Sequence, residues 1–93
     1  MWMRICTPRC MDAKRSVYIL QSETDPARYY TDLTSNLRAR LDAHNAGRCT
    51  HTVSGRPWSV VVTIDFTNED RAVKFERYLK SGSGRAFAKR HFR

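Results

Sequence analysis

Two periodicities in the hydrophobic pattern predict the strands and helices of this chain. Short runs rich in β-branched and aromatic residues predict strands at residues 17–20, 29–31 and 58–66. Apolar residues at helical spacing predict helices from residue 34 or 35 to 45, from 68 to 80 and from 85 to 92. The order ββαβαα predicts an α+β fold, in which helices flank a small three-stranded antiparallel sheet.

The run at 58–66 is the longest strand candidate. It is predicted to be the central strand, because a nearly continuous apolar run suits burial on both faces. The two earlier strands are predicted to form an antiparallel hairpin through a loop at 21–28, where Asp25-Pro26 is a turn signal. Residues 48–57 are predicted to be a polar loop.

Capping residues and glycines set the expected ends of the two longer helices. The first helix is expected to have Thr34 or Ser35 as its N-cap and to stop at Gly47. The second is expected to have Thr67 or Asn68 as its N-cap and to end at Gly82 or Gly84. Along the first helix, Leu37 and Leu41 form the expected buried ridge, and Arg40 and His44, also four residues apart, share a neighbouring face.

One carboxylate stands out on the second long helix. The apolar stripe of that helix runs through Ala72, Phe75 and Leu79, and the remaining core-facing position is Glu76. An acid aimed at or beside a core is costly unless a cation compensates it. Glu76 is therefore a candidate functional carboxylate, such as a metal ligand. The simpler alternative is an ion pair with Lys80 one turn away, worth only about 0.3–0.5 kcal/mol.

The charge balance indicates a polyanionic partner. The 93 residues include 17 Lys and Arg but only 9 Asp and Glu, which gives a formal net charge of +8. Most of the basic residues are Arg, whose planar fork matches phosphate. No run approaches a membrane span or a signal peptide, so an intracellular location is expected. One small folded domain is expected at 16–93, after a basic N-terminal tail at 1–15.

The cysteines do not form a disulfide framework. Cys6, Cys10 and Cys49 are odd in number, and with His51 they offer a possible zinc set. Their spacings match standard structural zinc sites poorly, so free thiols are the favoured interpretation. A zinc-stabilised adaptor remains the weakest of the functional alternatives.

Several motifs occur together in a specific order. They are Val17-Tyr18-Ile19, Tyr30-Thr31-Asp32, the helical segment 37–47, Arg56-Pro57-Trp58, the segment 72–80 and the segment 80–85. Each motif alone is weak, but the whole ordered set is specific. Over residues 16–92 the chain resembles the GIY-YIG nuclease domain, particularly its small stand-alone bacterial members.

This resemblance implies a divalent-metal phosphodiesterase and assigns its site. Tyr18 and Tyr30 match the tyrosines of the first and second motifs, and Arg40 and His44 match the arginine and histidine of the first helix. Glu76 matches the glutamate that holds one Mg²⁺ or Mn²⁺ ion. Water molecules and the substrate phosphate would complete the coordination shell of that ion.

The implied roles follow from the charge that develops on the phosphate. Arg40 would neutralise the oxygens of the phosphodiester under attack. Tyr18 is expected to be the base or the residue that positions the attacking water, which requires nearby cations to lower its pKa. Tyr30 and His44 are expected to help arrange the phosphate and the nucleophile.

Asp32 departs from the family pattern, because the second motif normally ends in glycine. The aspartate adds a negative charge beside a phosphate site. It could weaken nucleic-acid binding or contribute a second oxygen to the metal. The glycine of the first motif is also absent, and Ser16 stands there.

The sequence thus favours a metal-dependent endonuclease that acts on DNA in repair, recombination or processing. Selectivity for structure, such as branched, nicked or flapped DNA, is expected rather than sequence specificity, with RNA left open as a substrate. A monomer or weak dimer is expected. The alternative is a non-catalytic nucleic-acid-binding module in which Asp32 impairs catalysis. The candidate contacts to nucleic acid are Arg38, Arg48, Lys80, Arg85 and Lys89.

Overall fold

The computed structural model describes residues 14–93, so most of the expected tail at 1–15, including Cys6 and Cys10, lies outside the described residues. The elements are β1 (Ser16–Ser22), β2 (Tyr29–Thr34), α2 (Leu37–Asn45), the 3₁₀ helix η1 (Thr50–Gly55), β3 (Trp58–Asp65), α3 (Glu69–Lys80) and α4 (Gly82–His91). The predicted order of strands and α-helices is confirmed.

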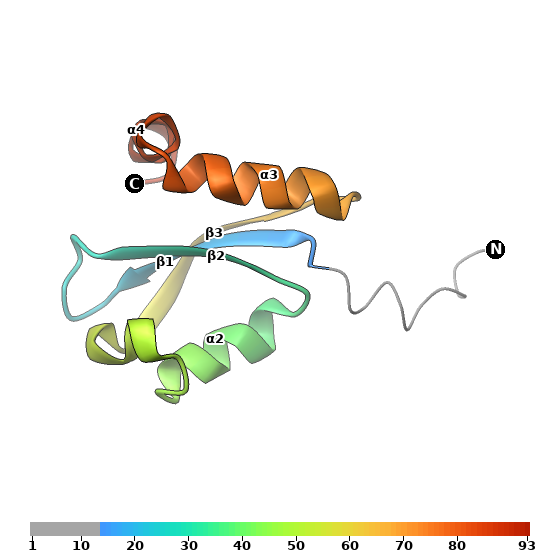
Figure 1. Cartoon of the computed structure of the whole chain (residues 1–93). Helices are drawn as coiled ribbons and strands as arrows, with labels where there is room; N and C mark the ends of the chain where they lie inside the picture. The colour runs from blue at the N-terminus through green and yellow to red at the C-terminus, as the bar shows by residue number, and fades with distance from the viewer. Residues whose placement is uncertain (1–13) are drawn as a thin grey trace, which may run out of the picture.

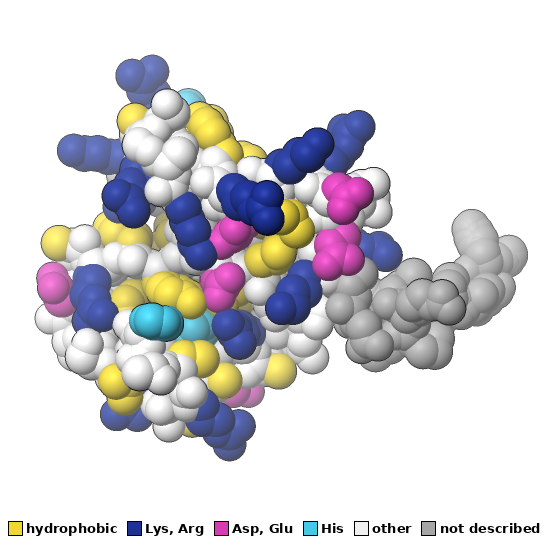
Figure 2. Space-filling model, viewed as in Figure 1, with side chains coloured by type: hydrophobic (Ala, Val, Ile, Leu, Met, Phe, Trp, Pro, Cys, Tyr) yellow, Lys and Arg dark blue, Asp and Glu magenta, His cyan; other side chains and the backbone are white. Residues whose placement is uncertain are grey.

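The molecule has three layers, with the sheet in the middle (Figure 1). Helices α3 and α4 cover one face, and α2 with η1 covers the other. This arrangement confirms the predicted α+β fold of a three-stranded antiparallel sheet flanked by helices. In the same view, Figure 2 shows Lys and Arg side chains spread over both helical layers, with acidic side chains between them near the middle.

The central strand is β1, and the prediction that the run at 58–66 is central is wrong. The strand order is β2-β1-β3, with both pairings antiparallel. Residues 17–20 of β1 are all buried, whereas Val60 of β3 is 37% exposed. β-branched side chains fit a pleated, half-buried surface, which an edge strand offers as well as a central one. The alternation of β1 instead supplies side chains to both helical layers.

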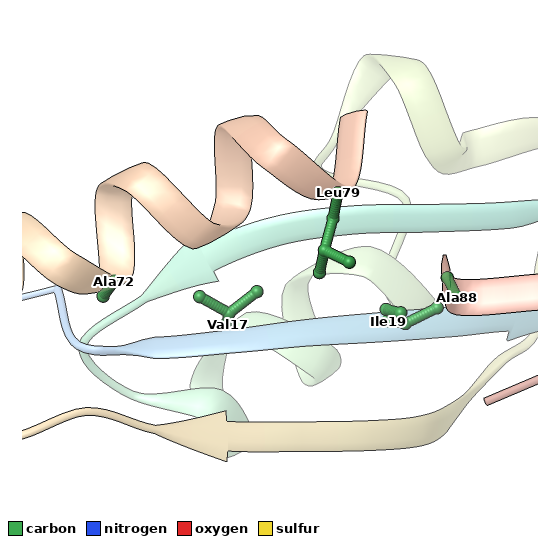
Figure 3. Packing of buried hydrophobic residues seen from close by; sticks show 5 residues of the cluster. All are labelled: Val17, Ile19, Ala72, Leu79 and Ala88. Atoms are coloured by element: carbon green, nitrogen blue, oxygen red, sulfur yellow. The ribbon is translucent and has the colours of Figure 1, made fainter. Parts of the chain in front are cut away.

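The core on the α3–α4 face is built on alternate residues of β1. Val17 and Ile19 point toward the helices and pack against Ala72 and Leu79 of α3 and Ala88 of α4 (Figure 3). All five side chains are buried. The stripe predicted for the second long helix is therefore the face that packs on the sheet.

The core on the opposite face uses the intervening residues of β1. Tyr18, Leu20 and Trp58 are buried together there, and the partly buried Leu37 and Leu41 pack against them. The expected ridge of the first helix is confirmed. This second core places the hydroxyl end of Tyr18 beneath α2.

The N-terminus of α2 lies slightly later than predicted. Asn36 is its N-cap and accepts a hydrogen bond from the backbone N–H of Ala39 at 3.1 Å. Thr34 and Ser35 were the expected caps, but Thr34 still belongs to β2 and pairs with Ser16. At the other long helix the prediction holds, because Asn68 caps α3.

Gly82 and Gly84 do not terminate a helix, contrary to expectation. Helix α3 ends at Lys80, and α4 already begins at Gly82. The Ser81 hydroxyl caps α4 by accepting from the backbone N–H of Gly84. A Cβ at Gly84 would lie 1.7 Å from the carbonyl oxygen of Tyr78, so glycine allows the two helices to meet closely.

The segment between α2 and β3 is more ordered than the predicted polar loop. Gly47, with φ +80°, follows the end of α2 as expected for a helix stop. The six residues of η1 then form a 3₁₀ helix that buries Thr52. None of the helices within residues 14–93 is long and apolar enough to cross a membrane.

Candidate functional site

A buried chain of hydrogen bonds joins β1, α2 and η1. The Tyr18 hydroxyl lies 3.0 Å from Nε2 of His44, and Nδ1 of His44 lies 2.8 Å from Oγ1 of Thr52. Thr52 uses its single hydroxyl proton on the carbonyl oxygen of Cys49, at 3.3 Å. The Thr52 oxygen therefore accepts Nδ1–H, and Nε2 accepts the Tyr18 O–H. Tyr18, His44 and Thr52 each have 0% exposed surface.

Beside this chain, a charged cluster is centred on Asp32. Arg40 donates from Nε to the Tyr18 hydroxyl at 3.2 Å and from Nη2 to Oδ2 of Asp32 at 3.1 Å. The Tyr30 hydroxyl also donates to Oδ2 at 3.0 Å, and the backbone N–H of Leu33 donates to Oδ1 at 2.8 Å. The Asp32 carboxylate thus accepts three hydrogen bonds. The side chains of Arg40 and Asp32 are 40% and 23% exposed, so their ion pair lies between Tyr18 and solvent.

The two tyrosines are protonated at neutral pH. Burial raises the pKa of Tyr18 well above its ordinary value, and the hydrogen bond from Arg40 only partly opposes this. Burial and the neighbouring Asp32 raise the pKa of Tyr30 to about 12. In the resting site Arg40 lowers the pKa of Tyr18 less than burial of the hydroxyl raises it.

The remaining groups have defined charges. Burial and the Arg40 charge lower the pKa of His44, so the imidazole is neutral at neutral pH. Burial tends to raise the pKa of Asp32, but the hydrogen bonds from Leu33, Tyr30 and Arg40 together lower it below its ordinary value. The site therefore holds a carboxylate, a guanidinium and a neutral imidazole.

Glu76 approaches from α3, on the other side of β2. It is 9% exposed and lies on the buried stripe of the helix, as predicted. Its carboxylate forms an ion pair with Lys80 one turn away, at 2.5 Å. Helix α3 packs on β2, and Lys80 is close enough to Asp32 to contribute to its lowered pKa. Lys80 therefore pairs with Glu76 and lies within electrostatic range of Asp32.

The donor set suits a hard cation better than zinc. Within residues 14–93, no group of three or more His, Cys, Asp or Glu side chains gathers around a common point. Cys49 is a free thiol, while Cys6 and Cys10 lie outside the described residues. A single buried carboxylate such as Glu76 fits Mg²⁺ or Mn²⁺, because Mg²⁺ in particular keeps several waters and uses substrate phosphates as further ligands.

The candidate contacts to nucleic acid fall in different places, although all are exposed. Lys80 and Arg85 line one cavity of about 490 Å³ between the β1–β2 hairpin and the α3–α4 layer. Arg38 lies on α2 and Arg48 follows it, in the opposite layer. Lys89 lies on α4 without lining the cavity.

Thr52 is a site residue that the sequence did not indicate. It orients His44, yet it lies in a polar segment without hydrophobic periodicity. Its burial depends on α2 and β3 closing around η1, so only the tertiary structure identifies it. Arg28 and Arg93, which also line the cavity, were likewise not singled out.

Comparison with known proteins identifies relatives of this chain. The family model of the GIY-YIG catalytic domain matches residues 14–90. A UPF0213 protein of Staphylococcus haemolyticus (strain JCSC1435) is 33% identical over 72 residues, which cover 76% of this chain and 85% of that protein. No solved structure gives a significant match. The chain therefore belongs to the GIY-YIG nuclease family, as the order of its motifs indicated.

Proposed function

We propose that this protein is a divalent-metal-dependent endonuclease that hydrolyses phosphodiester bonds in DNA. The observation that carries the proposal is the hydrogen-bonded chain from Tyr18 through His44 to Thr52, with Arg40 bonded to the same Tyr18 hydroxyl. This row of hydrogen bonds can accept a proton from water, next to the Arg40 guanidinium, which can bind phosphate. Membership of the GIY-YIG family supports a nucleic-acid substrate.

The proton of the attacking water leaves through a relay. Tyr18 is too weak an acid to be ionised beforehand, since burial raises its pKa. Its oxygen therefore receives the proton from water while its own proton passes to Nε2 of His44. The water oxygen forms the new bond to phosphorus, the bond to the leaving oxygen breaks, and that oxygen takes a proton from solvent. Thr52 keeps Nδ1–H in place, which holds His44 in the accepting tautomer.

Arg40 binds the phosphate in this scheme. Its guanidinium can form two parallel hydrogen bonds to a phosphate, and it offsets the charge that develops on the nonbridging oxygens. In the resting state the same guanidinium bonds to Asp32 and Tyr18. Because Tyr18 is fully buried beneath this pair, the phosphate must draw Arg40 away from Asp32 before water can reach the Tyr18 hydroxyl.

Glu76 is the proposed metal ligand. A Mg²⁺ or Mn²⁺ ion bound there would act as a Lewis acid toward the phosphate oxygens. The carboxylate is held on a helix face that packs against the sheet, so its position is well defined. Its partner Lys80 has a half-exposed side chain that can move into solvent.

A second candidate function has its own supporting observation. Asp32 occupies both Arg40 and Tyr30, and Tyr18 has no exposed surface. If this arrangement is permanent, the chain is a nucleic-acid-binding module on a nuclease fold. The first function requires the Asp32–Arg40 ion pair to open when substrate binds, and the second requires it to stay closed.

A substrate panel separates the two functions. Duplex, nicked, flapped and branched DNA and a matching RNA would be incubated with Mg²⁺, with Mn²⁺ and with excess chelator. Internal cleavage of the DNA strand supports the endonuclease if it depends on metal and is fastest on the flapped or branched DNA. Binding to the same substrates without cleavage under any metal condition selects the binding module.

A further inference from the structure

A basic cavity lies next to the candidate site. It has a volume of about 490 Å³ and lies between the β1–β2 hairpin and the α3–α4 layer. Its cationic side chains are Lys80, Arg85 and Arg93. Arg28 also lines it, but its guanidinium contacts η1 and the Trp58 ring in the opposite layer. Among the described residues, no Asp or Glu lines the cavity. Three like charges around one cavity repel one another, so an anion bound there would be stabilised.

Two of these cations lack a carboxylate partner within residues 14–93. Lys80 pairs with Glu76, but neither ion pair of this part of the chain involves Arg85 or Arg93. Arg93 donates to the carbonyl oxygen of Arg85, which is a neutral acceptor. These two guanidiniums therefore keep their full charge available to a ligand.

The floor of the cavity is apolar. Ile19, Leu79 and Ala88 line it together with the ring of Tyr29. The Arg93 guanidinium lies 4.5 Å from the centroid of that ring. A simple anion such as phosphate would use only the guanidiniums, whereas a nucleotide would also cover the floor with its sugar and base. The volume falls within the roughly 300–1,000 Å³ of small-molecule pockets.

The cavity adjoins the candidate site at Lys80. This residue lines the cavity and pairs with Glu76. Tyr30 of the edge strand β2 also lines the cavity, but its ring packs against Tyr18, Leu20 and Trp58 on the other face of the sheet. A nucleic-acid strand with one phosphate at Glu76 would therefore pass Lys80 and reach the cavity.

We infer that this cavity binds an unpaired nucleotide next to the cleaved bond, with its phosphate at Arg85 and Arg93 and its sugar and base on the apolar floor. An unpaired nucleotide fits this floor better than a paired one, because a base inside a duplex stacks on its neighbours and does not expose its face. The inference rests on the proposed function and names its substrate class: nucleic acid with a single-stranded segment beside the cleavage point.

The test compares two double variants of equal charge. Arg85→Ala/Arg93→Ala removes two cations of the cavity, and Arg71→Ala/Arg90→Ala removes two exposed cations that do not line it. The affinity of each protein is measured for three ligands in excess chelator. They are a single strand of about 12 nucleotides, a blunt duplex of the same sequence, and inorganic phosphate. We expect the cavity variant to lose affinity for the single strand about tenfold and the matched control less than about threefold. Circular dichroism checks that both variants remain folded.

Amide chemical shifts in the wild-type protein locate the ligand. The single strand should shift the amides of Thr31 and Ala88, which line the cavity, and should bind more tightly than the duplex. Equal losses in the two double variants, or no binding of the single strand by the wild type, would overturn the inference. Phosphate binding as tightly as the single strand would also overturn it, because the cavity would then be a simple anion site.

Chelator keeps this test independent of catalysis. A separate cleavage assay with metal addresses the proposed function. Binding through the cavity without cleavage would reject the endonuclease and retain the cavity. If the cavity variant cleaves and binds DNA as the wild type does, the cavity proposal is rejected and the endonuclease is retained.

Discussion

At the scale of single residues, Asp32 determines the hydrogen bonds of the candidate site in the absence of substrate. Its carboxylate holds Arg40 and Tyr30, the two groups that a substrate phosphate would otherwise meet. The pair formed with Arg40 also separates the buried Tyr18 from solvent. A glycine here, as in the usual family motif, would leave both donors free.

Replacing Asp32 should therefore increase phosphate binding. We expect Asp32→Gly to raise DNA affinity and the cleavage rate by about tenfold, since a charged hydrogen bond to be displaced is worth about 1.5–3 kcal/mol. The glycine should lower the free energy of unfolding by about 1–3 kcal/mol, because the three hydrogen bonds to the carboxylate are lost and the backbone gains freedom. Asp32→Asn, which removes the charge but keeps the shape, should be intermediate. Slower cleavage by both variants would show that Asp32 takes part in the reaction.

His44 links the site to pH. Burial and Arg40 lower its pKa, so the folded state binds its proton less readily than the unfolded state, whose ordinary pKa is about 6.5. Below that pH the unfolded state takes up more protons, and the free energy of unfolding falls as pH decreases. The slope for one proton is at most about 1.4 kcal/mol per pH unit.

Urea unfolding between about pH 7.5 and 5 measures this slope. The free energy of unfolding of the wild type should fall as the pH decreases over this range. That of His44→Gln should fall less. The control is His91→Gln on the exposed end of α4, which should behave like wild type. Parallel pH dependences in wild type and His44→Gln would contradict the burial of a neutral imidazole.

At the scale of elements, the junction of α3 and α4 positions the cavity. Ser81 separates the two helices and caps α4, and Gly84 allows close contact with the end of α3. The lining residues Lys80 and Arg85 stand on either side of this junction. A change in the angle between these helices would alter both the cavity and the approach to Glu76.

Two glycines of this junction provide a matched pair. Gly84→Ala places a Cβ 1.7 Å from the Tyr78 carbonyl oxygen, so the helices must separate, at a cost of about 1–3 kcal/mol or more. At Gly82 an added Cβ meets nothing within 4 Å, so Gly82→Ala should be neutral or slightly stabilising. Thermal unfolding should show a fall of several degrees for Gly84→Ala alone. Equal melting temperatures would mean that the junction is not tightly packed.

Several features of these elements could be predicted from sequence because they depend on local spacing. The stripe of α3 placed Glu76 on a buried face, and the i, i+4 relation placed Arg40 and His44 together on α2. The central strand was missed because β-branched residues fit any pleated, half-buried surface and do not indicate which strand is covered on both sides. Thr52 and the Asp32–Arg40 ion pair depend on contacts between distant segments, which no local pattern contains.

At the scale of the whole molecule, charge governs the encounter with nucleic acid. The chain has a net charge of +8. Among the described residues, Lys and Arg side chains are spread over both helical layers (Figure 2), and the cavity gathers Lys80, Arg85 and Arg93 on one side. Such a distribution attracts a polyanion from any direction, while the cavity and the site would fix its orientation.

Affinity for single-stranded DNA should therefore depend strongly on salt. If about four phosphates are contacted, a plot of log K against log salt should have a slope of roughly −3. The cavity variant Arg85→Ala/Arg93→Ala should reduce this slope by about one or more. Titrations at several salt concentrations give both values, and a slope near zero would mean that binding does not use the basic residues.

Cleavage by a Glu76 variant tests the central claim most directly. Glu76→Gln keeps the size of the side chain and removes the charge, while the control Glu69→Gln changes an exposed acid in the first turn of the same helix. Wild type and control should cleave flapped DNA with Mg²⁺ or Mn²⁺, and Glu76→Gln should be at least about a hundredfold slower while remaining folded. Cleavage by Glu76→Gln at the wild-type rate would contradict a metal-dependent nuclease site at this position.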